Sequence, residues 1–471
     1  MLNRVFDNDT ICAIATPHGM GAIAVIRISG PEAIPVVSQL FTQNGKAFDT
    51  DKMVSHKTYC GHIVDHGELL DEVLVTFFKA PHSFTGEDSA EISVHGSVFV
   101  QQKLLQVLIA HGCRMAEAGE FTRRAFVNRK FDLAQAEAIA DLISSESEAA
   151  HRVAINQLKG GFSKELQMMR SKLLEMTSLM ELELDFSEED VEFADRSQLK
   201  ALLQEALDHV NKLKDSFRLG NAIKNGIPVA IVGQTNTGKS TLLNALLGED
   251  RAIVSDIAGT TRDTIEGTLN INGILYRFID TAGLRNTDET IEKIGIERSY
   301  RKISEANVII GMLDATTDYE SMFSSAREIA SKVDFQHQQL ILCINKVDTL
   351  SDQGEALLGE LRLDLDNDNI MVICLSAKHG FGLNDLYNTL KHSQPLASPD
   401  ATLVTNVRHY EALMHAAESL KSVQRGLEMN IPTDLVSQDL REALFHLGSI
   451  TGEITTDEVL GTIFSRFCIG K

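Results

Sequence analysis

The stretch Gly233–Ser240, GQTNTGKS, sets the architecture of the chain around it. Its spacing of two glycines, a lysine and a serine is that of a phosphate-binding P-loop. An apolar run at 227–232 precedes it and predicts a buried parallel strand, and the run at 240–247 carries its leucines on one helical face. Because this motif needs a strand, a glycine-rich turn and a helix, we prefer it to a chance glycine-rich loop.

The helix expected after the turn would hold the phosphates of a nucleotide, because main-chain N–H groups at a helix start bind phosphate. Lys239 would reach the β- and γ-phosphates, and Ser240 would ligate Mg²⁺. The residues predicted to line this part of the site are Asn236, Thr237, Gly238, Lys239, Ser240 and Thr241.

The length and composition limit the possible classes of protein. With 471 residues the chain is too long for one core, and we expect two or three domains. A net charge of −22 does not favour a nucleic-acid partner except through a local basic patch. There is no apolar signal core and no run of about 18 apolar residues, which predicts a cytoplasmic protein without a membrane contact. The six cysteines contain no CxxC pair, so neither a zinc site nor a disulfide framework is expected.

The chain divides into four regions by its patterns. Residues 1–127 are expected to form an α+β domain. Residues 128–218 and 391–471 are predicted to be helical, because apolar residues recur there at three- and four-residue spacing. Residues 219–390 alternate strand and helix. A sheet domain between two helical stretches indicates that the sheet domain is inserted into a single helical domain.

The region 219–390 is predicted to be a doubly wound, mostly parallel sheet with ligands at the carboxyl ends of its strands. The strands expected there are 227–232, 274–279, 307–313, 338–344 and 370–375. In the first region the expected strands are 11–16, 22–28, 72–78 and 91–95.

Basic residues in the first region and at its boundary with the second allow two interpretations. Arg27 interrupts an apolar strand, and the simpler interpretation is a strand-end side chain that reaches water. A denser basic cluster comprises Arg123, Arg124, Arg129 and Lys130. A solvated face and a contact to a ligand or RNA are equally compatible with that cluster.

Further motifs indicate that the nucleotide is GTP. Asp280–Gly283, DTAG, follows one expected strand, where the aspartate meets the Mg²⁺ shell and the glycine N–H can sense the γ-phosphate. Asn345–Asp348, NKVD, closes the fourth strand, and Ser376–Lys378, SAK, closes the fifth. The Asp348 carboxylate would accept from N1–H and the 2-amino group of guanine. Adenine has neither donor, so the motifs argue against an ATPase.

The segment Gly259–Asp263, GTTRD, lies between the P-loop and DTAG and offers a switch threonine for Mg²⁺. The GTP-binding residues predicted beyond the P-loop are Ser255, Thr260, Thr261, Asp280, Thr281, Ala282, Gly283, Asn345, Lys346, Asp348, Ser376, Ala377 and Lys378. Leu284 stands where many small GTPases place the glutamine that orients water. Glu292 is a candidate for that task, although an exposed helix carboxylate is the simpler interpretation of the pattern.

With these motifs placed, the chain resembles the MnmE (TrmE) family of tRNA-modifying GTPases from end to end. The stretches that carry the resemblance beyond the GTPase motifs are Gly21–Gly30, Ser83–Asp88, Arg124–Glu137 and Phe467–Lys471. The resemblance implies an N-terminal domain that binds a tetrahydrofolate and forms a homodimer, and a helical domain formed from both flanks of the GTPase domain. Family positions for the folate match Arg27, Glu87, Lys130 and Lys471.

The resemblance also implies partners and ions. The family works with the FAD-binding protein MnmG (GidA) as a heterotetramer and installs an aminomethyl or carboxymethylaminomethyl group at C5 of the tRNA wobble uridine. Its one-carbon unit comes from 5,10-methylene-tetrahydrofolate, for which 5-formyl-tetrahydrofolate is a stable analogue. A potassium ion replaces an arginine finger, and its matching positions are Asn236, Ser255, Ile257 and Thr260. Thr261 matches the switch threonine on Mg²⁺, and Glu292 acquires a catalytic role beside Lys239.

Two details depart from the common family pattern. The P-loop reads QTNT where relatives often have proline and valine, and Lys378 stands where an arginine is common. Neither change removes a polar ligand. Two other functions remain open, a GTP-dependent ribosome-assembly factor and a folate-binding regulator that only senses GTP. The first is disfavoured because the chain shows no basic RNA-binding module of the KH type.

Overall fold

The computed structural model describes residues 9–185, 196–248, 267–279, 303–349, 360–361, 365, 369–392, 402–429, 431–465, 467 and 469–470. The chain forms two compact units. One comprises Met1–Ile143, Asn156–Asn211 and Glu411–Lys471, and the other comprises Ser144–Ile155 and Lys212–Tyr410.

The first unit contains an eight-stranded sheet in the order β4-β3-β5-β6-β7-β2-β1-β8. Its strand pairs are antiparallel except for β1 and β8, which run parallel. Alternate side chains such as Ile26, Val75 and Ile92 form a core under helices α1 and α2. The bounds are β1 Thr10–Ile14, β2 Ile23–Ser29, α1 Ala33–Leu40, β3 Phe41–Gln43, β4 Lys46–Ala47, β5 Thr58–Asp65, β6 Glu68–Phe78, β7 Ser89–His95, α2 Val98–Ala110 and β8 Cys113–Met115.

The four strands predicted for this region correspond to β1, β2, β6 and β7, but β3, β4, β5 and β8 were missed. Strand β5 reads TYCGHIVD, in which a glycine and polar residues hide the period-two pattern. Gly61 is needed because a Cβ there would lie 2.2 Å from the main-chain oxygen of Thr42 on β3. The other missed strands have only two or three residues each, too few to show a period.

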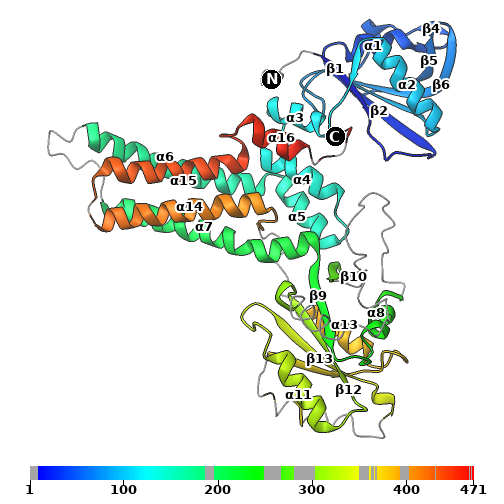
Figure 1. The fold of residues 1–471 in the computed structure, drawn as a ribbon. Helices are drawn as coiled ribbons and strands as arrows, with labels where there is room; N and C mark the ends of the chain where they lie inside the picture. Colours follow the sequence, from blue (N-terminus) through cyan, green and yellow to red (C-terminus); the bar gives the residue numbers. More distant parts are fainter. Residues whose placement is uncertain are drawn as a thin grey trace. The chain divides into compact units, whose positions relative to one another are not determined.

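Long helices make up the rest of this unit. Helix α15 packs along α6, and hydrogen bonds join Lys172 on α6 to Glu205 on α7 and Gln424 on α14 to Gln204 on α7 (Figure 1). Helices α5 and α6 are separated at Gly160, which has φ +78°. The bounds are α3 Glu120–Val127, α4 Leu133–Ile143, α5 Glu148–Leu158, α6 Gly161–Asp185, α7 Arg196–Asn225, α14 Val407–Glu428, α15 Thr433–Thr451 and α16 Asp457–Phe464.

The second unit contains a six-stranded sheet in the order β10-β11-β9-β12-β13-β14. All neighbours are parallel except β10 and β11, which confirms the mostly parallel sheet. The edge strand β10 was missed, although Asn272 and Gly273 have the positive φ angles of a tight hairpin turn. The bounds are β9 Ile227–Gly233, α8 Lys239–Gly248, β10 Gly267–Ile271, β11 Ile274–Phe278, β12 Val308–Asp314, α11 Tyr319–Ala330, β13 Gln339–Asn345, β14 Ile370–Cys374 and α13 Leu383–His392.

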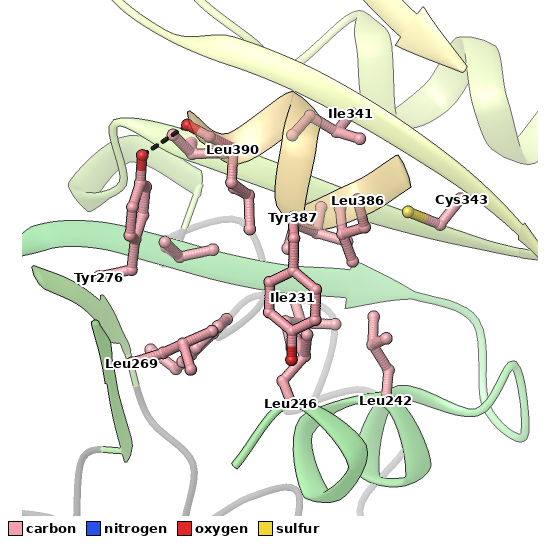
Figure 2. Close-up of a cluster of buried hydrophobic side chains, with 14 of the residues drawn as sticks. Ile231, Leu242, Leu246, Leu269, Tyr276, Ile341, Cys343, Leu386, Tyr387 and Leu390 are labelled. Atoms are coloured by element: carbon pink, nitrogen blue, oxygen red, sulfur yellow. Dashed lines mark hydrogen bonds between the residues drawn. The ribbon is translucent and has the colours of Figure 1, made fainter. Parts of the chain in front are cut away.

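Helices cover both faces of this sheet. Ile231 on β9 packs with Leu242 on α8 and Leu386 on α13, as Figure 2 shows. At the end of α13 the Tyr276 hydroxyl donates to the Leu390 carbonyl at 2.5 Å. The alternate side chains of β9 belong to a second core with α11. This two-faced burial is what a doubly wound sheet requires.

Helix α5 up to Ile155, helix α7 from Lys212 and the start of α14 up to Tyr410 belong to the second unit. The N–H of Ala149 donates to the Gly273 carbonyl at 3.1 Å, and Ala150 is buried with Ile223 and Leu403. No described helix combines the length and the apolar composition needed to cross a bilayer.

Candidate functional site

The P-loop connects β9 to α8, and two of its positions accept only glycine. Gly233 has φ +148°, and a Cβ there would lie 2.4 Å from the Met312 carbonyl oxygen. Gly238 has φ +95°, and a Cβ there would lie 2.2 Å from Nδ2 of Asn345. The loop therefore packs directly against the ends of β12 and β13.

Lys239, the first residue of α8, folds back over the loop. Its Nζ donates to the carbonyl oxygens of Gly233 at 2.9 Å and Gln234 at 2.6 Å. Thr237 is buried and donates to the same Gln234 oxygen at 2.9 Å. Asn236 is exposed and has φ +61°. A cationic Nζ beside a turn of main-chain N–H groups is an arrangement that holds anions such as phosphate.

Asn345 joins this loop to the one after β14. Its Nδ2 donates to the Thr237 carbonyl at 2.8 Å, and its Oδ1 accepts from the N–H of Ala377 at 2.9 Å. The side chain is 3 % exposed. The structure thus brings residues of GKS, NKVD and SAK together at the carboxyl end of the sheet.

Lys346 is held by a partner that the sequence analysis missed. Its Nζ donates to Oδ2 of Asp314 at 2.5 Å, at the end of β12. Burial alone would raise the pKa of Asp314, but hydrogen bonds from Lys346 and Thr316 outweigh it and lower that pKa. The sequence could have indicated this partner, because Asp314 ends an apolar strand that lies between the two strands carrying the P-loop and NKVD.

The predicted base-binding carboxylate lies at the same edge of the sheet. Asp348 is in a short 3₁₀ turn after β13, is exposed, and lies 3.6 Å from Nε2 of His379. Ser376 is fixed by a main-chain hydrogen bond to Phe381, and Lys378 beside it is exposed.

Several predicted residues lie outside the described part of the chain. They are Ser255, Ile257, Thr260, Thr261, Asp280, Thr281, Ala282, Gly283, Glu292 and Lys471. The two switch segments and the final residue of the folate prediction therefore stay predictions from sequence.

A second group of predicted residues lies in the first unit. Arg27 is in the middle of β2, and its guanidinium donates to Glu91 on β7 at 2.9 Å and lies over the Phe84 ring at 4.9 Å. The interpretation as a strand-end side chain reaching water is wrong, because a cross-strand carboxylate and an aromatic ring hold the guanidinium.

Glu87 is the acceptor at the centre of this group. Its Oε2 accepts from Ser29 at 2.8 Å and from Nη1 of Arg124 at 3.1 Å. Arg124 also bonds to Asp9 and Glu120, and Arg114 bonds to the same two carboxylates. The result is a partly buried ion network behind the loop that carries Glu87.

The basic cluster of the first region therefore does not form one solvated face. Arg124 is 12 % exposed in the ion network, whereas Arg129 and Lys130 are exposed. Nζ of Lys130 donates to the Pro81 carbonyl at 2.9 Å, and Nδ2 of Asn128 donates to Thr85. These contacts bring the cluster against the loop that contains Glu87.

The chain's tail approaches the same region. Ile469 pairs with Ala118 in an isolated β-bridge, and a Cβ on Gly470 would lie 2.2 Å from the Ile14 carbonyl at the end of β1. On β1, the strand beside Arg27's strand, Ala13 pairs with Arg27. Residues from four separate stretches of sequence thus meet at one side of the first sheet.

Comparisons with known proteins cover the whole chain. The model described as "MnmE helical domain" matches residues 133–468, and the one described as "GTP-binding protein TrmE N-terminus" matches 10–130. A tRNA modification GTPase MnmE of Bacteroides fragilis is 51 % identical over 469 residues, covering 99 % of this chain and 100 % of that protein. One from Flavobacterium johnsoniae is 51 % identical over 470 residues, with the same coverage.

Two solved structures each match part of the chain. Aquifex aeolicus Era bound to GDP and aluminium fluoride is 28 % identical and covers 41 % of this chain and 66 % of its own, with a TM-score of 0.27. The G domain of T. maritima FeoB is 25 % identical, covering 36 % and 98 %, with a TM-score of 0.25. These scores are too low to say more about the fold.

Proposed function

The chain belongs to the MnmE family of tRNA modification GTPases, and from that premise we propose that it hydrolyses GTP in the modification of tRNA. The observation that carries the proposal is 51 % identity along the whole chain to proteins of that name. The joining of the phosphate loop to the NKVD and SAK loops through Asn345 supports it.

In this proposal each described residue of the GTP site has one task. Lys239 exchanges its two loop carbonyls for the β- and γ-phosphates, and the main-chain N–H groups of 236–240 bind the same phosphates. Ser240, at the helix start, offers a hydroxyl oxygen of the kind that Mg²⁺ prefers. Asp348 accepts from the guanine base, and its exposed carboxylate at the strand edge suits that task.

The chain has Leu284 where many small GTPases have a glutamine, and we propose that no arginine finger acts. Other groups must therefore stabilise the transferring phosphoryl group and orient the attacking water. A potassium ion would supply positive charge to the transferring phosphoryl group. The oxygens assigned to it come from Asn236, Ser255, Ile257 and Thr260. The amide oxygen of exposed Asn236 fits such a cation at the surface of the P-loop. Glu292 would orient the attacking water, and Thr261 would complete the Mg²⁺ shell.

We further propose that the folate chemistry belongs to the N-terminal domain. We place a dimerising tetrahydrofolate domain at 1–127, a helical domain at 128–218 and 391–471, and the GTPase domain at 219–390. The FAD-binding partner MnmG would join the dimer in a cytoplasmic heterotetramer. Together they would transfer the one-carbon unit of 5,10-methylene-tetrahydrofolate to C5 of the wobble uridine.

The folate site would be formed by Arg27, Glu87, Lys130 and the terminal Lys471. The observation that favours it is that Arg27 and Lys130 contact Phe84 and Pro81, on the loop that carries Glu87. The tail at Gly470 lies beside Ile14, at the end of the strand next to that of Arg27. A carboxylate suits the donor edge of a pterin ring, and basic groups suit the glutamate of the folate.

The proposal is tested by GTP hydrolysis in matched potassium and sodium salts. Potassium should give fast turnover and sodium slow turnover, because the ion would take the place of an arginine finger, which is worth roughly 10³ to 10⁵ in rate. Glu292→Ala should keep nucleotide binding and lose turnover. Equal rates in both salts would remove the ion from the proposal, and full activity of Glu292→Ala would remove the glutamate.

A further inference from the structure

The carboxylate of Glu87 is held from two sides. Ser29 donates to Oε2 at 2.8 Å, and Ser29 itself lies in a buried hydroxyl cluster with Thr85 at 2.6 Å and Ser89 at 3.2 Å. From the other side Nη1 of Arg124 approaches Oε2 at 3.1 Å and Oε1 at 3.3 Å. Oε2 therefore accepts two close hydrogen bonds, whereas Oε1 accepts one longer one and can accept a further hydrogen bond from a ligand.

Arg124 can fix Glu87 because it is itself fixed. Its Nη2 donates to Asp9 at 2.6 Å and to Glu120 at 3.0 Å, and its Nη1 also donates to the Asp9 carbonyl at 2.9 Å. Glu120 is only 2 % exposed. A planar guanidinium bonded on both nitrogens has one orientation, so its contact to Glu87 is directional.

We propose that Arg124 is a positioning residue of the folate site, which holds the Glu87 carboxylate in the orientation in which Oε1 accepts from the ligand. The inference rests on the proposed folate function. Glu87 lies on the loop after β6, is 26 % exposed, and without these donors would be free to take other rotamers. Fixing the acceptor before binding lowers the entropy that the ligand must overcome.

Arg114 provides the matched comparison. Its guanidinium bonds to Glu120 at 2.7 Å and to Asp9 at 2.7 Å, so it belongs to the same ion network. Its described hydrogen bonds do not include Glu87. A general loss of stability would weaken folate binding by variants of both arginines equally, whereas a positioning role predicts the larger loss for Arg124, which bonds to Glu87 directly.

The test is a double-mutant cycle with 5-formyl-tetrahydrofolate, measured by titration calorimetry on the full chain. We expect Glu87→Gln and Arg124→Gln each to weaken binding about 10- to 100-fold, the effect of losing a hydrogen bond to a charged group. The double variant should bind no more weakly than Glu87→Gln. Arg114→Gln should lose clearly less affinity than Arg124→Gln, because Arg114 shares Asp9 and Glu120 with Arg124 but its described hydrogen bonds do not reach Glu87.

Stability is followed in parallel by thermal unfolding. If Arg124→Gln does not fold, Arg124→Lys replaces it in the cycle, because lysine keeps the charge but cannot reach three carboxylates at once. Arg124→Lys is expected to lose folate affinity in the same way.

The outcomes separate the inference from the function on which it rests. Unchanged binding by Glu87→Gln would overturn the folate site itself. Weakened binding by Glu87→Gln with wild-type binding by both Arg124 variants would overturn the positioning role alone. Losses that multiply in the double variant would also overturn it, because Arg124 would then act independently of Glu87.

Discussion

Asn345 donates from Nδ2 to the carbonyl oxygen of Thr237, 2.8 Å away, and so ties the strand that carries the base-recognition motif to the phosphate loop. Its other side-chain atom accepts from Ala377 in the loop after β14. One buried amide thus sets the spacing of the three loops that a guanine nucleotide would touch.

Replacing this amide should cost both stability and nucleotide affinity. Asn345→Ala leaves the Thr237 carbonyl and the Ala377 N–H without their partner, at about 2 kcal/mol or more in the free energy of unfolding. Urea unfolding and GDP titration measure the two effects. Asn244→Ala, an exposed position on α8, is the control. Equal stability of the two variants would contradict the linking role.

Alanine substitutions at Gly238 and Gly248 should have opposite effects on the stability of the fold. In Gly238→Ala the new Cβ would lie 2.2 Å from Nδ2 of Asn345 at a backbone φ of +95°, so nucleotide binding and folding should both suffer. In Gly248→Ala the Cβ meets no atom of the described residues within 4 Å, and the change should be neutral or slightly stabilising. Normal GDP binding by Gly238→Ala would show that the loop tolerates another geometry.

Base specificity depends on one carboxylate. Asp348→Asn turns an acceptor for N1–H and the 2-amino group into a group that can also donate, so GTP should bind more weakly and xanthosine triphosphate more tightly. Competition titration of the two nucleotides measures the change. If GTP affinity is the same as in the unmodified chain, Asp348 does not contact the base.

The ion network of the first unit predicts acid sensitivity. Burial alone would raise the pKa of Glu120, but hydrogen bonds from Arg114, the Glu117 N–H and Arg124 outweigh it and hold the pKa below 4.5, its ordinary value. A lowered pKa stabilises the fold above 4.5, and that stability is lost as pH falls through the folded-state pKa.

Glu120→Gln should therefore unfold more easily than the unmodified chain at pH 7, by about 2 kcal/mol. The difference should shrink as the pH falls below 4.5. Hydrogen exchange at α3, Glu120–Val127, measures it locally. A difference that persists unchanged at low pH would mean that the ionised carboxylate is not what stabilises this helix.

Local pattern was sufficient to predict much of the second unit. The five parallel strands were predicted within one or two residues, because buried apolar runs bounded by motif residues are long enough to recognise. The antiparallel β10 was missed although Asn272 and Gly273 form a common hairpin signal. The motifs place Asn345 and Thr237 at the ends of two predicted strands, but no local pattern predicts the hydrogen bond that joins them across 108 positions.

The first unit shows why some side chains could not be interpreted from pattern. Arg124 looked like one of four clustered basic residues, yet its partner Asp9 lies 115 positions earlier and Glu87 lies 37 positions earlier. Only the sheet brings them together. Arg27 was misinterpreted for the same reason, since Glu91 is 64 positions away and becomes its neighbour through the pairing of β2 with β7.

The decisive measurement is the content of modified wobble uridines in tRNA from cells that lack this chain. The cells are complemented with the unmodified gene or with Lys239→Ala, and tRNA nucleosides are compared by liquid chromatography and mass spectrometry. We expect the nucleosides carrying a C5 aminomethyl or carboxymethylaminomethyl group to disappear on deletion, to return with the unmodified chain, and to stay absent with Lys239→Ala. Unchanged wobble nucleosides in the deleted cells would contradict the role in tRNA, and full restoration by Lys239→Ala would contradict the need for GTP turnover.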